Sequence, residues 1–131
     1  MGNDIAFTGV RRDQIIDIWP LVADIIKRGC DKFNNLTLDG VFDDLHSGSQ
    51  LWVAGCNDIT SVCVTRIYKN GNCNIELCAG QDVDKIVSFL PIIEQWAKEN
   101  GAKRMRMQGR PGWRKKLTSY KLEKIIMEKS L

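Results

Sequence analysis

The sequence is poor in metal-ligating residues and in long apolar runs. It has one histidine, and none of its five cysteines form a Cys-x-x-Cys pair, so the ligand spacing of a zinc site is missing and we expect no metal. No apolar run approaches the roughly 20 residues that a membrane-spanning helix needs, and we expect no membrane partner. The segment MGNDIAFTGV lacks the basic and then apolar pattern of a secretory signal, and Ala6 stands where a myristoylation motif needs Ser or Thr.

The cysteines also lack the pattern of a disulfide framework. Their odd number, without an export signal, predicts free thiols in a reducing compartment. Cys73 and Cys78 are separated by an odd number of positions, so on one strand they are expected to face opposite sides. We interpret the cysteines as small buried apolar residues.

The composition is that of a soluble globular protein. Of the 131 residues, 44% are hydrophobic and 27% are charged, which excludes disordered, collagen-like and coiled-coil classes. The length suits one compact domain, 1–131, and no repeat, low-complexity stretch or linker divides it.

Helix-period and strand-period segments alternate along the first part of the chain. A first helix is predicted from the cap Asp13 to near Gly29, with a kink or break at Pro20. A second helix begins at the cap Thr37 and ends before Gly48. Three strand-like runs follow, and the short polar gaps between them predict an antiparallel meander. The runs are Gln50 to Cys56, Thr60 to Tyr68 and Cys73 to Ala79.

The rest of the chain alternates again. A long helix is predicted over 83–99, ending at Gly101, and a strand over 103–108 with Met105 and Met107 on one face. A Gly-Arg-Pro-Gly-Trp turn leads into a short basic helix through Leu117, and 122–127 is the last predicted strand. With a strand before the first helix, the order is β-α-α-β-β-β-α-β-α-β, an α+β domain with helices on both faces of its sheet.

Basic residues are concentrated near the end of the chain. From Lys98 onward there are eleven Lys and Arg against three Glu, a balance of +8, whereas residues 1–97 carry −5. Such a patch attracts a phosphate-bearing ligand, nucleic acid or an acidic protein surface; alternatively, it is a solvated face that keeps the protein soluble. No recognition-helix or RNA-binding signature accompanies the charge. The densest run consists of Arg104, Arg106, Arg110, Arg114, Lys115 and Lys116.

Five local sequences, taken with the element order, carry a resemblance to a known family. They are Ile18-Trp19-Pro20-Leu21, Leu51-Trp52-Val53-Ala54, Ile93-Glu94-Gln95-Trp96-Ala97, Gly109-Arg110-Pro111-Gly112-Trp113 and Glu128-Lys129-Ser130-Leu131. The chain resembles the GCN5-related N-acetyltransferase (GNAT) fold over nearly its whole length. It is similar, more narrowly, to small GNAT-like proteins of tailed bacteriophages and prophages. The resemblance implies a GNAT-like mixed sheet and a place in the host cytoplasm or in the virion.

The resemblance also implies where acetyl-CoA would bind. In the family, its pyrophosphate rests on a loop of pattern Q/R-x-x-G-x-G/A before the long helix, where glycines let backbone N–H groups approach. The matching stretch has one glycine, with Asp82 and Asp84 near the phosphate position, so it departs from the pattern. The implied cofactor-binding positions are Leu77, Ala79, Gly80, Gln81 and Lys85.

Two catalytic positions follow from the resemblance. Glu76 lies where some family enzymes keep a carboxylate that deprotonates the acceptor amine, and Tyr120 lies where active members place a tyrosine that protonates the departing thiolate. The alternatives are an ordinary surface residue of a strand for Glu76 and a loop or packed tyrosine for Tyr120.

Three functions follow from these observations. The first is a phage-encoded protein that no longer transfers acetyl groups and serves as a virion-associated, assembly or interaction module with phage structural proteins as partners. The second is an active acyl-CoA-dependent N-acyltransferase acting on a protein or a small amine, with Glu76 as base and Tyr120 as acid. The third is a nucleic-acid-binding module that uses the basic run.

Overall fold

Helices and strands follow one another in the computed structural model much as the sequence predicts. The structure describes residues 5–31, 36–81, 83–108, 121–123 and 126–131, at backbone level only over 83–85, 108, 121–123 and 126–129. The helices are η1 (Arg12–Gln14, a 3-10 turn), α1 (Ile15–Cys30), α2 (Leu38–Ser47) and α3 (Val83–Glu99). The strands are β1 (Ala6–Val10), β2 (Gln50–Gly55), β3 (Ile59–Ile67), β4 (Asn72–Gly80), β5 (Arg104–Gln108), β6 (Lys121–Glu123) and β7 (Ile126–Ser130).

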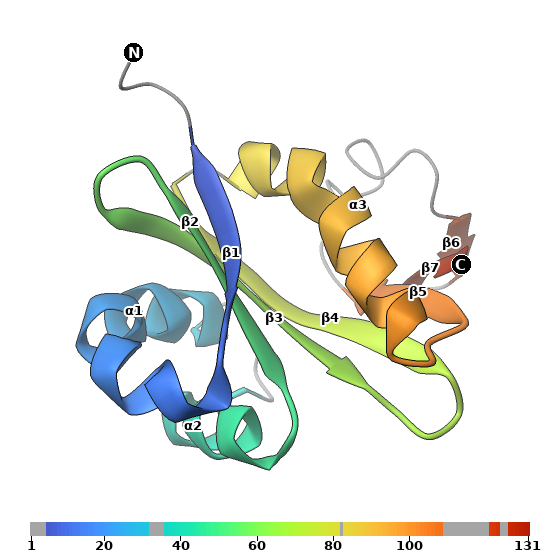
Figure 1. Cartoon of the computed structure of the whole chain (residues 1–131), viewed down its shortest axis with the longest axis horizontal. Coiled ribbons are helices and arrows are strands. Elements are labelled where there is room, and N and C mark those ends of the chain that lie inside the picture. Colours follow the sequence, from blue (N-terminus) through green and yellow to red (C-terminus); the bar gives the residue numbers. More distant parts are fainter. Residues whose placement is uncertain (1–4, 32–35, 82, 109–120, 124–125) are drawn as a thin grey trace.

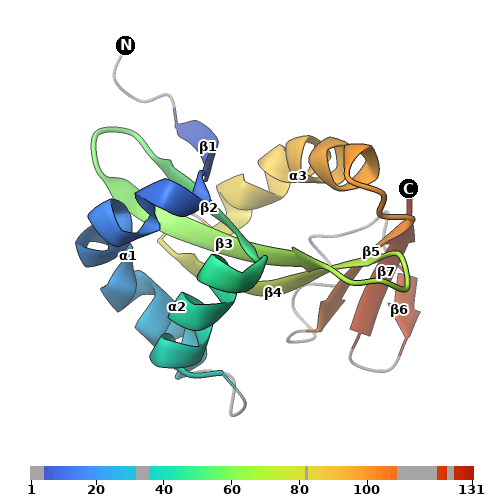
Figure 2. The same ribbon diagram turned by 60° about the horizontal axis from the view of Figure 1, so that its bottom comes forward.

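The strands form one mixed sheet in the order β1-β2-β3-β4-β5-β7-β6 (Figure 1). Neighbouring strands are antiparallel except β4 and β5, which are parallel and are joined through α3. In Figure 2, α3 lies on one face of the sheet, and α1 and α2 lie on the other. The predicted α+β class, with an antiparallel meander and helices on both faces, is confirmed.

The end of the chain differs from the prediction of a single strand over 122–127. The backbone reverses inside this stretch, so that β6 and β7 pair antiparallel, with Leu122 opposite Met127 and Glu123 opposite Ile126. The sequence does not predict this reversal, because the two residues between the strands, Lys124 and Ile125, include no Gly or Asn of the kind that favours a hairpin. The predicted short basic helix falls in 109–120, outside the described residues.

The helix ends show which capping predictions hold. Thr37 caps α2, since its Oγ1 accepts a hydrogen bond of 3.0 Å from the Gly40 N–H, as predicted. The prediction for Asp13 is wrong: it lies in η1, forms an ion pair with Arg11, and leaves Gln14 at the N-cap without a side-chain bond. The helix α1 is also continuous through Pro20. Pro20 lies on the solvent side, where water can satisfy the carbonyl that the missing N–H leaves unpaired.

Two apolar cores, one on each face, hold the sheet between the helices. The α3 face includes Met105 and Met107, only 0% and 4% exposed, which confirms their predicted shared face. On that face the indole N–H of Trp52 donates to Thr65 Oγ1 at 3.0 Å. The core under α1 and α2 includes Ile26, Leu45, Leu51, Val62, Val64 and Leu77.

A bulge in β4 overturns the prediction that Cys73 and Cys78 face opposite sides. Both side chains belong to the α3 face, because the extra residue Glu76 shifts the alternation by one position. Cys78 thereby meets Cys63 of β3, with their Sγ atoms 3.2 Å apart. None of the five cysteines forms a disulfide, as predicted, but Cys56 is exposed rather than buried.

Thiol labelling should separate these cysteines. In the folded protein at mildly alkaline pH, we expect a small aromatic disulfide reagent to modify Cys56 first and Cys63 and Cys73 only after unfolding. Burial raises the pKa of Cys73 to about 12, which keeps its thiol protonated. Mass spectrometry of quenched samples locates the label, and Cys56→Ser should remove the fast phase. Rapid labelling of Cys63 or Cys73 in the native state would contradict their buried placement.

Candidate active site

The described pairing between β4 and β5 ends in the middle of β4. Their register runs from Asn72 opposite Arg104 to Ile75 opposite Met107 and, among the described residues, goes no further. The β4 bulge lies at this point: Thr65 of β3 is opposite Ile75, Val64 is opposite Leu77, and Glu76 is the extra residue. Beyond it, β4 stays paired with β3 on one side, and its other edge has no strand partner among the described residues.

Helix α1 supports this diverging end of β4. Gly29 packs so closely that a Cβ added there would lie 2.7 Å from Leu77 Cδ1 and 2.9 Å from Ala79 Cβ. Gly80, which ends the strand, has φ +128° and presses against Thr60 and Ser61 of β3. The backbone over 77–80 is therefore held firmly from one face and one edge.

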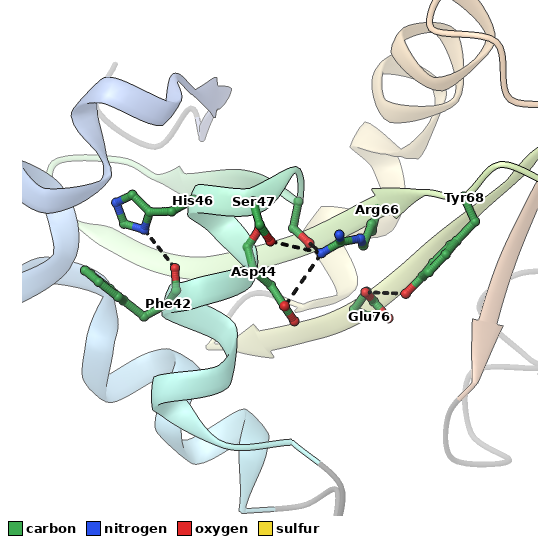
Figure 3. A network of polar contacts seen from close by, with 8 residues as sticks. Phe42, Asp44, His46, Ser47, Arg66, Tyr68 and Glu76 are labelled. Atoms are coloured by element: carbon green, nitrogen blue, oxygen red, sulfur yellow. Dashed lines mark hydrogen bonds and ion pairs between the residues drawn. The ribbon is translucent and has the colours of Figure 1, made fainter.

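Glu76 and Tyr68 form the polar centre of the α1 and α2 face. The Tyr68 hydroxyl donates a hydrogen bond of 3.0 Å to Glu76 Oε1 (Figure 3). Tyr68 is 39% exposed and Glu76 is half-buried, so the pair is open to solvent on one side. This bond fixes the direction of the carboxylate at the point where β4 and β5 separate.

Arg66 ties this pair to α2. Its guanidinium lies 3.6 Å from Asp44 Oδ1, donates to Ser47 and Ser49, and stands over the Tyr68 ring at 5.9 Å from the centroid. Figure 3 shows Arg66 between the Asp44 carboxylate and the Tyr68–Glu76 pair. The guanidinium is thus engaged on the α2 side, and Tyr68 is held between it and Glu76.

The pKa of Glu76 is raised above the ordinary carboxyl value. Burial is the largest cause, and the nearby Asp44 adds to it, whereas the Tyr68 hydrogen bond and Arg66 act in the lowering direction. The pKa of Tyr68 is raised as well, first by burial and then by the Glu76 charge. A carboxylate whose pKa is moved upward toward neutrality is a better proton acceptor than an ordinary one.

The predicted cofactor positions are partly brought together. Leu77 and Ala79 bury their side chains under α1, so they offer only backbone groups to a ligand. Ala79, Gly80 and Gln81 line a pocket of about 380 Å³ that also includes Arg28 of α1. The Lys85 side chain lies outside the described residues.

Of Tyr120 and the predicted basic run, the structure describes only Arg104 and Arg106. Arg104 is exposed, whereas Arg106 is half-buried, so these two are not one uniform surface patch. Tyr120 and the rest of the basic run, Arg110, Arg114, Lys115 and Lys116, lie outside the described residues.

Sequence reasoning missed Tyr68, Arg66 and Asp44. Tyr68 and Arg66 occupy alternate positions near the end of the predicted strand Thr60 to Tyr68, which places them on one face. Their meeting with Glu76 depends on the β3–β4 register, which the bulge shifts. The alternation of the strand could have placed Tyr68 and Arg66 on one face, but it could not identify Glu76 of β4 as the residue that they meet.

Comparison with solved structures identifies this architecture. No protein-family model and no curated protein sequence matches the chain. The PaiA N-acetyltransferase of Thermoplasma acidophilum, in complex with coenzyme A, is 11% identical with TM-score 0.68, covering 98% of this chain and 99% of that one. A GNAT family acetyltransferase of Elizabethkingia anophelis with acetyl-CoA bound is 11% identical with TM-score 0.69, at 98% and 99% coverage. The fold is that of the GNAT acetyltransferases.

A third GNAT acetyltransferase structure is similar over almost its whole length. Aminoglycoside 6′-acetyltransferase type Ii is 10% identical with TM-score 0.73, covering 95% of this chain and 96% of that one. The resemblance stated from the sequence is therefore confirmed for the GNAT fold, while its narrower part, an origin in tailed bacteriophages, stays a prediction.

The described part of the chain contains neither a cluster of metal-ligating side chains nor a membrane-spanning helix. Among those residues, no group of three or more His, Cys, Asp or Glu side chains could hold a metal ion. No helix in the same part of the chain is long and apolar enough to cross a membrane.

Proposed function

We propose that this protein is an acetyl-CoA-dependent N-acetyltransferase. The observation that carries the proposal is the end of the described β4–β5 pairing at Ile75, directly beside the bulge residue Glu76, within the GNAT fold. Solved proteins of this fold hold coenzyme A or acetyl-CoA, as in the Thermoplasma and Elizabethkingia structures. The edge of β4 over 77–80, which has no strand partner in the described part of the chain, offers backbone N–H and C=O groups to the extended pantetheine arm.

The residues of this chain suit transfer to an amine. Acetyl-CoA, when bound, supplies an activated acetyl thioester. Glu76 takes the proton of the acceptor amine, and its raised pKa matches this task. Tyr68 holds the Glu76 carboxylate in place through the 3.0 Å hydrogen bond. In this proposal, backbone N–H groups after the bulge polarise the carbonyl oxygen of the thioester, and Tyr120 is the acid that protonates the departing thiolate.

The phosphate end of the site departs from the family pattern. In the sequence, two acidic residues, Asp82 and Asp84, stand on either side of Val83, the first residue of α3, although a helix N-terminus otherwise favours an anion. Lys85, the next residue along the chain, has the opposite charge. We expect the β4 edge to contribute most of the affinity, so that free pyrophosphate binds much more weakly than acetyl-CoA.

Calorimetric titration tests the proposal. We expect saturable binding of acetyl-CoA and of CoA that survives moderate salt, with little heat from pyrophosphate, because the contacts with the pantetheine arm are uncharged. A thermal shift of the protein with acetyl-CoA provides an independent readout. Absence of binding in both measurements would overturn the proposal.

The other predicted functions would then gain weight. A non-catalytic module in virion assembly, with phage structural proteins as partners, requires a protein of this fold that binds no acetyl-CoA. A nucleic-acid module requires affinity that falls steeply with salt. Both remain predictions, and binding of acetyl-CoA would count against the first of them.

A further inference from the structure

Two Asn–Arg pairs lie side by side where β4 and β5 are still joined. Asn72 is opposite Arg104, and Asn74 is opposite Arg106, on the same face of the parallel pair. In the first pair, Arg104 Nη1 donates a hydrogen bond of 3.2 Å to Asn72 Oδ1. The same two residue types at the same register would be expected to bond in the same way at the second position.

The second pair, Asn74 and Arg106, does not form this hydrogen bond. Asn74 Oδ1 and Arg106 Nε are both buried and have no hydrogen-bond partner among the described residues. The large majority of buried side-chain polar atoms in proteins have a hydrogen-bond partner, and an unpaired group on a charged side chain is especially costly. Two such atoms on adjacent strands, one an acceptor and the other a donor, are therefore the kind of pair that a ligand satisfies.

Their position relates them to Glu76. Asn74 lies two residues before Glu76 on β4 and belongs to the same face, the side of α1 and α2. Across the sheet, Asn74 stands between Arg66 of β3 and Arg106 of β5. Alternate residues on a strand are about 7 Å apart, and neighbouring strands about 5 Å apart, so one small molecule can reach both places.

The two arginines beside Asn74 differ in their hydrogen-bond and ion-pair partners. Arg66 already contacts Asp44, Ser47 and Ser49. Arg106 keeps its buried Nε–H unpaired, and a guanidinium donor of this kind matches a carboxylate or phosphate oxygen.

We propose that Arg106 and Asn74 bind an anionic group on the acceptor, whose amine reaches Glu76. This rests on the proposed acetyltransferase function and adds the acceptor class: a primary amine that also carries a carboxylate or a phosphate. Arg106 Nε–H donates to the anionic oxygen, and Asn74 Oδ1 accepts from an N–H of the acceptor. An acceptor without an anionic group leaves the Arg106 Nε–H without a hydrogen-bond partner and is disfavoured.

Matched acceptors and variants test this. Lysine is compared with cadaverine, which lacks its carboxylate, and phosphoethanolamine with ethanolamine; the two pairs distinguish carboxylate from phosphate. We expect wild type to prefer the acidic member by at least about tenfold in kcat/KM, mostly through KM, in keeping with a charge-assisted hydrogen bond. Arg106→Gln should remove the preference, Arg106→Lys should restore part of it, and the control Arg104→Gln should keep it.

Direct binding separates failure of this inference from failure of the proposed function. Calorimetry of the same acceptors, with and without CoA, should show weaker binding of the acidic member to Arg106→Gln, while acetyl-CoA affinity stays unchanged. Equal use and equal binding of acidic and acid-free amines by wild type would overturn the inference and leave acetyl transfer standing. Loss of the preference in Arg104→Gln as well would also overturn it. Failure to bind acetyl-CoA would instead overturn the proposed function. In that case, the binding of acidic and acid-free amines without CoA still tests whether Arg106 and Asn74 bind an anionic group.

Discussion

Replacing Glu76 by Gln is expected to lower kcat/KM for amine acetylation by about 10²–10⁴-fold near neutral pH, the usual contribution of a positioned general base. Gln keeps the shape of the side chain and can still accept the hydrogen bond from Tyr68, so the change removes only the proton acceptor. Steady-state kinetics with a saturating acyl donor measure the effect. Acetyl-CoA affinity should stay unchanged, because the proposed contacts with the cofactor are made by residues beyond the bulge.

The pH profile gives this prediction a second readout. Because burial raises the pKa of Glu76, the rise of kcat/KM with pH should begin above the ordinary carboxyl range in wild type. Glu76→Gln should lose this limb. Tyr68→Phe should move it further toward alkaline pH, since the hydrogen bond from Tyr68 lowers the pKa of Glu76. A profile that keeps the limb in Glu76→Gln would contradict the assignment of the base.

Stability distinguishes a chemical role from a structural one. A carboxyl whose pKa is higher in the folded than in the unfolded chain binds more protons when folded, so the free energy of unfolding falls as pH rises through the window between the two values. Glu76→Gln has no such proton, so near neutral pH it should be at least as stable as wild type. An inactive variant that was also strongly destabilised would mean that Glu76 supports the fold.

Much of the fold could be predicted because local chemistry and packing agree along the chain. Thr37 has the side chain that an N-cap needs, and it caps α2. Met105 and Met107 alternate with arginines, and this pattern places them in the core under α3. At these positions a single segment carries the information, so that no partner strand has to be known.

The site was less predictable because it depends on register between strands. Glu76 was assigned from resemblance alone, whereas its environment arises from the bulge opposite Val64 and Thr65. The same bulge reverses the expected side of Cys78. A strand pattern with period two has no signal for one inserted residue, and therefore the meeting of Tyr68 with Glu76 was hidden in the sequence.

The sequence also could not show that Arg106, opposite Asn74, differs from its neighbour Arg104. Sequence analysis grouped Arg106 with Arg104 as part of one basic run, since the two share a charge and a strand face. The structure separates them, because Arg104 bonds to Asn72 while Arg106 has a buried, unpaired Nε. Net charge identifies where cations gather, but only packing determines which of them a ligand must satisfy.

Gly29→Val should have the largest effect on stability, and it should also weaken acetyl-CoA binding by displacing β4. A Cβ at this position would lie 2.9 Å from Ala79 Cβ, which is fixed to the backbone and cannot move aside without β4. Overpacking of this kind costs about 1–3 kcal/mol. Because β4 beyond the bulge has no described β5 partner, pushing it away from α1 should also distort the edge that we propose binds acetyl-CoA. Urea unfolding and calorimetric titration measure the two effects.

A size series keeps this prediction open to refutation. Gly29→Ala gains about 1 kcal/mol of helix propensity, which offsets part of the clash, so its net loss should be smaller than that of the Val variant. Ile16→Val changes a side chain that is 67% exposed on the same helix and should alter neither stability nor affinity. If Gly29→Val bound acetyl-CoA as tightly as wild type while losing stability, the edge of β4 would not depend on α1. The affinity would then have to come from the phosphate end of the site, where Asp82 and Asp84 make it least expected.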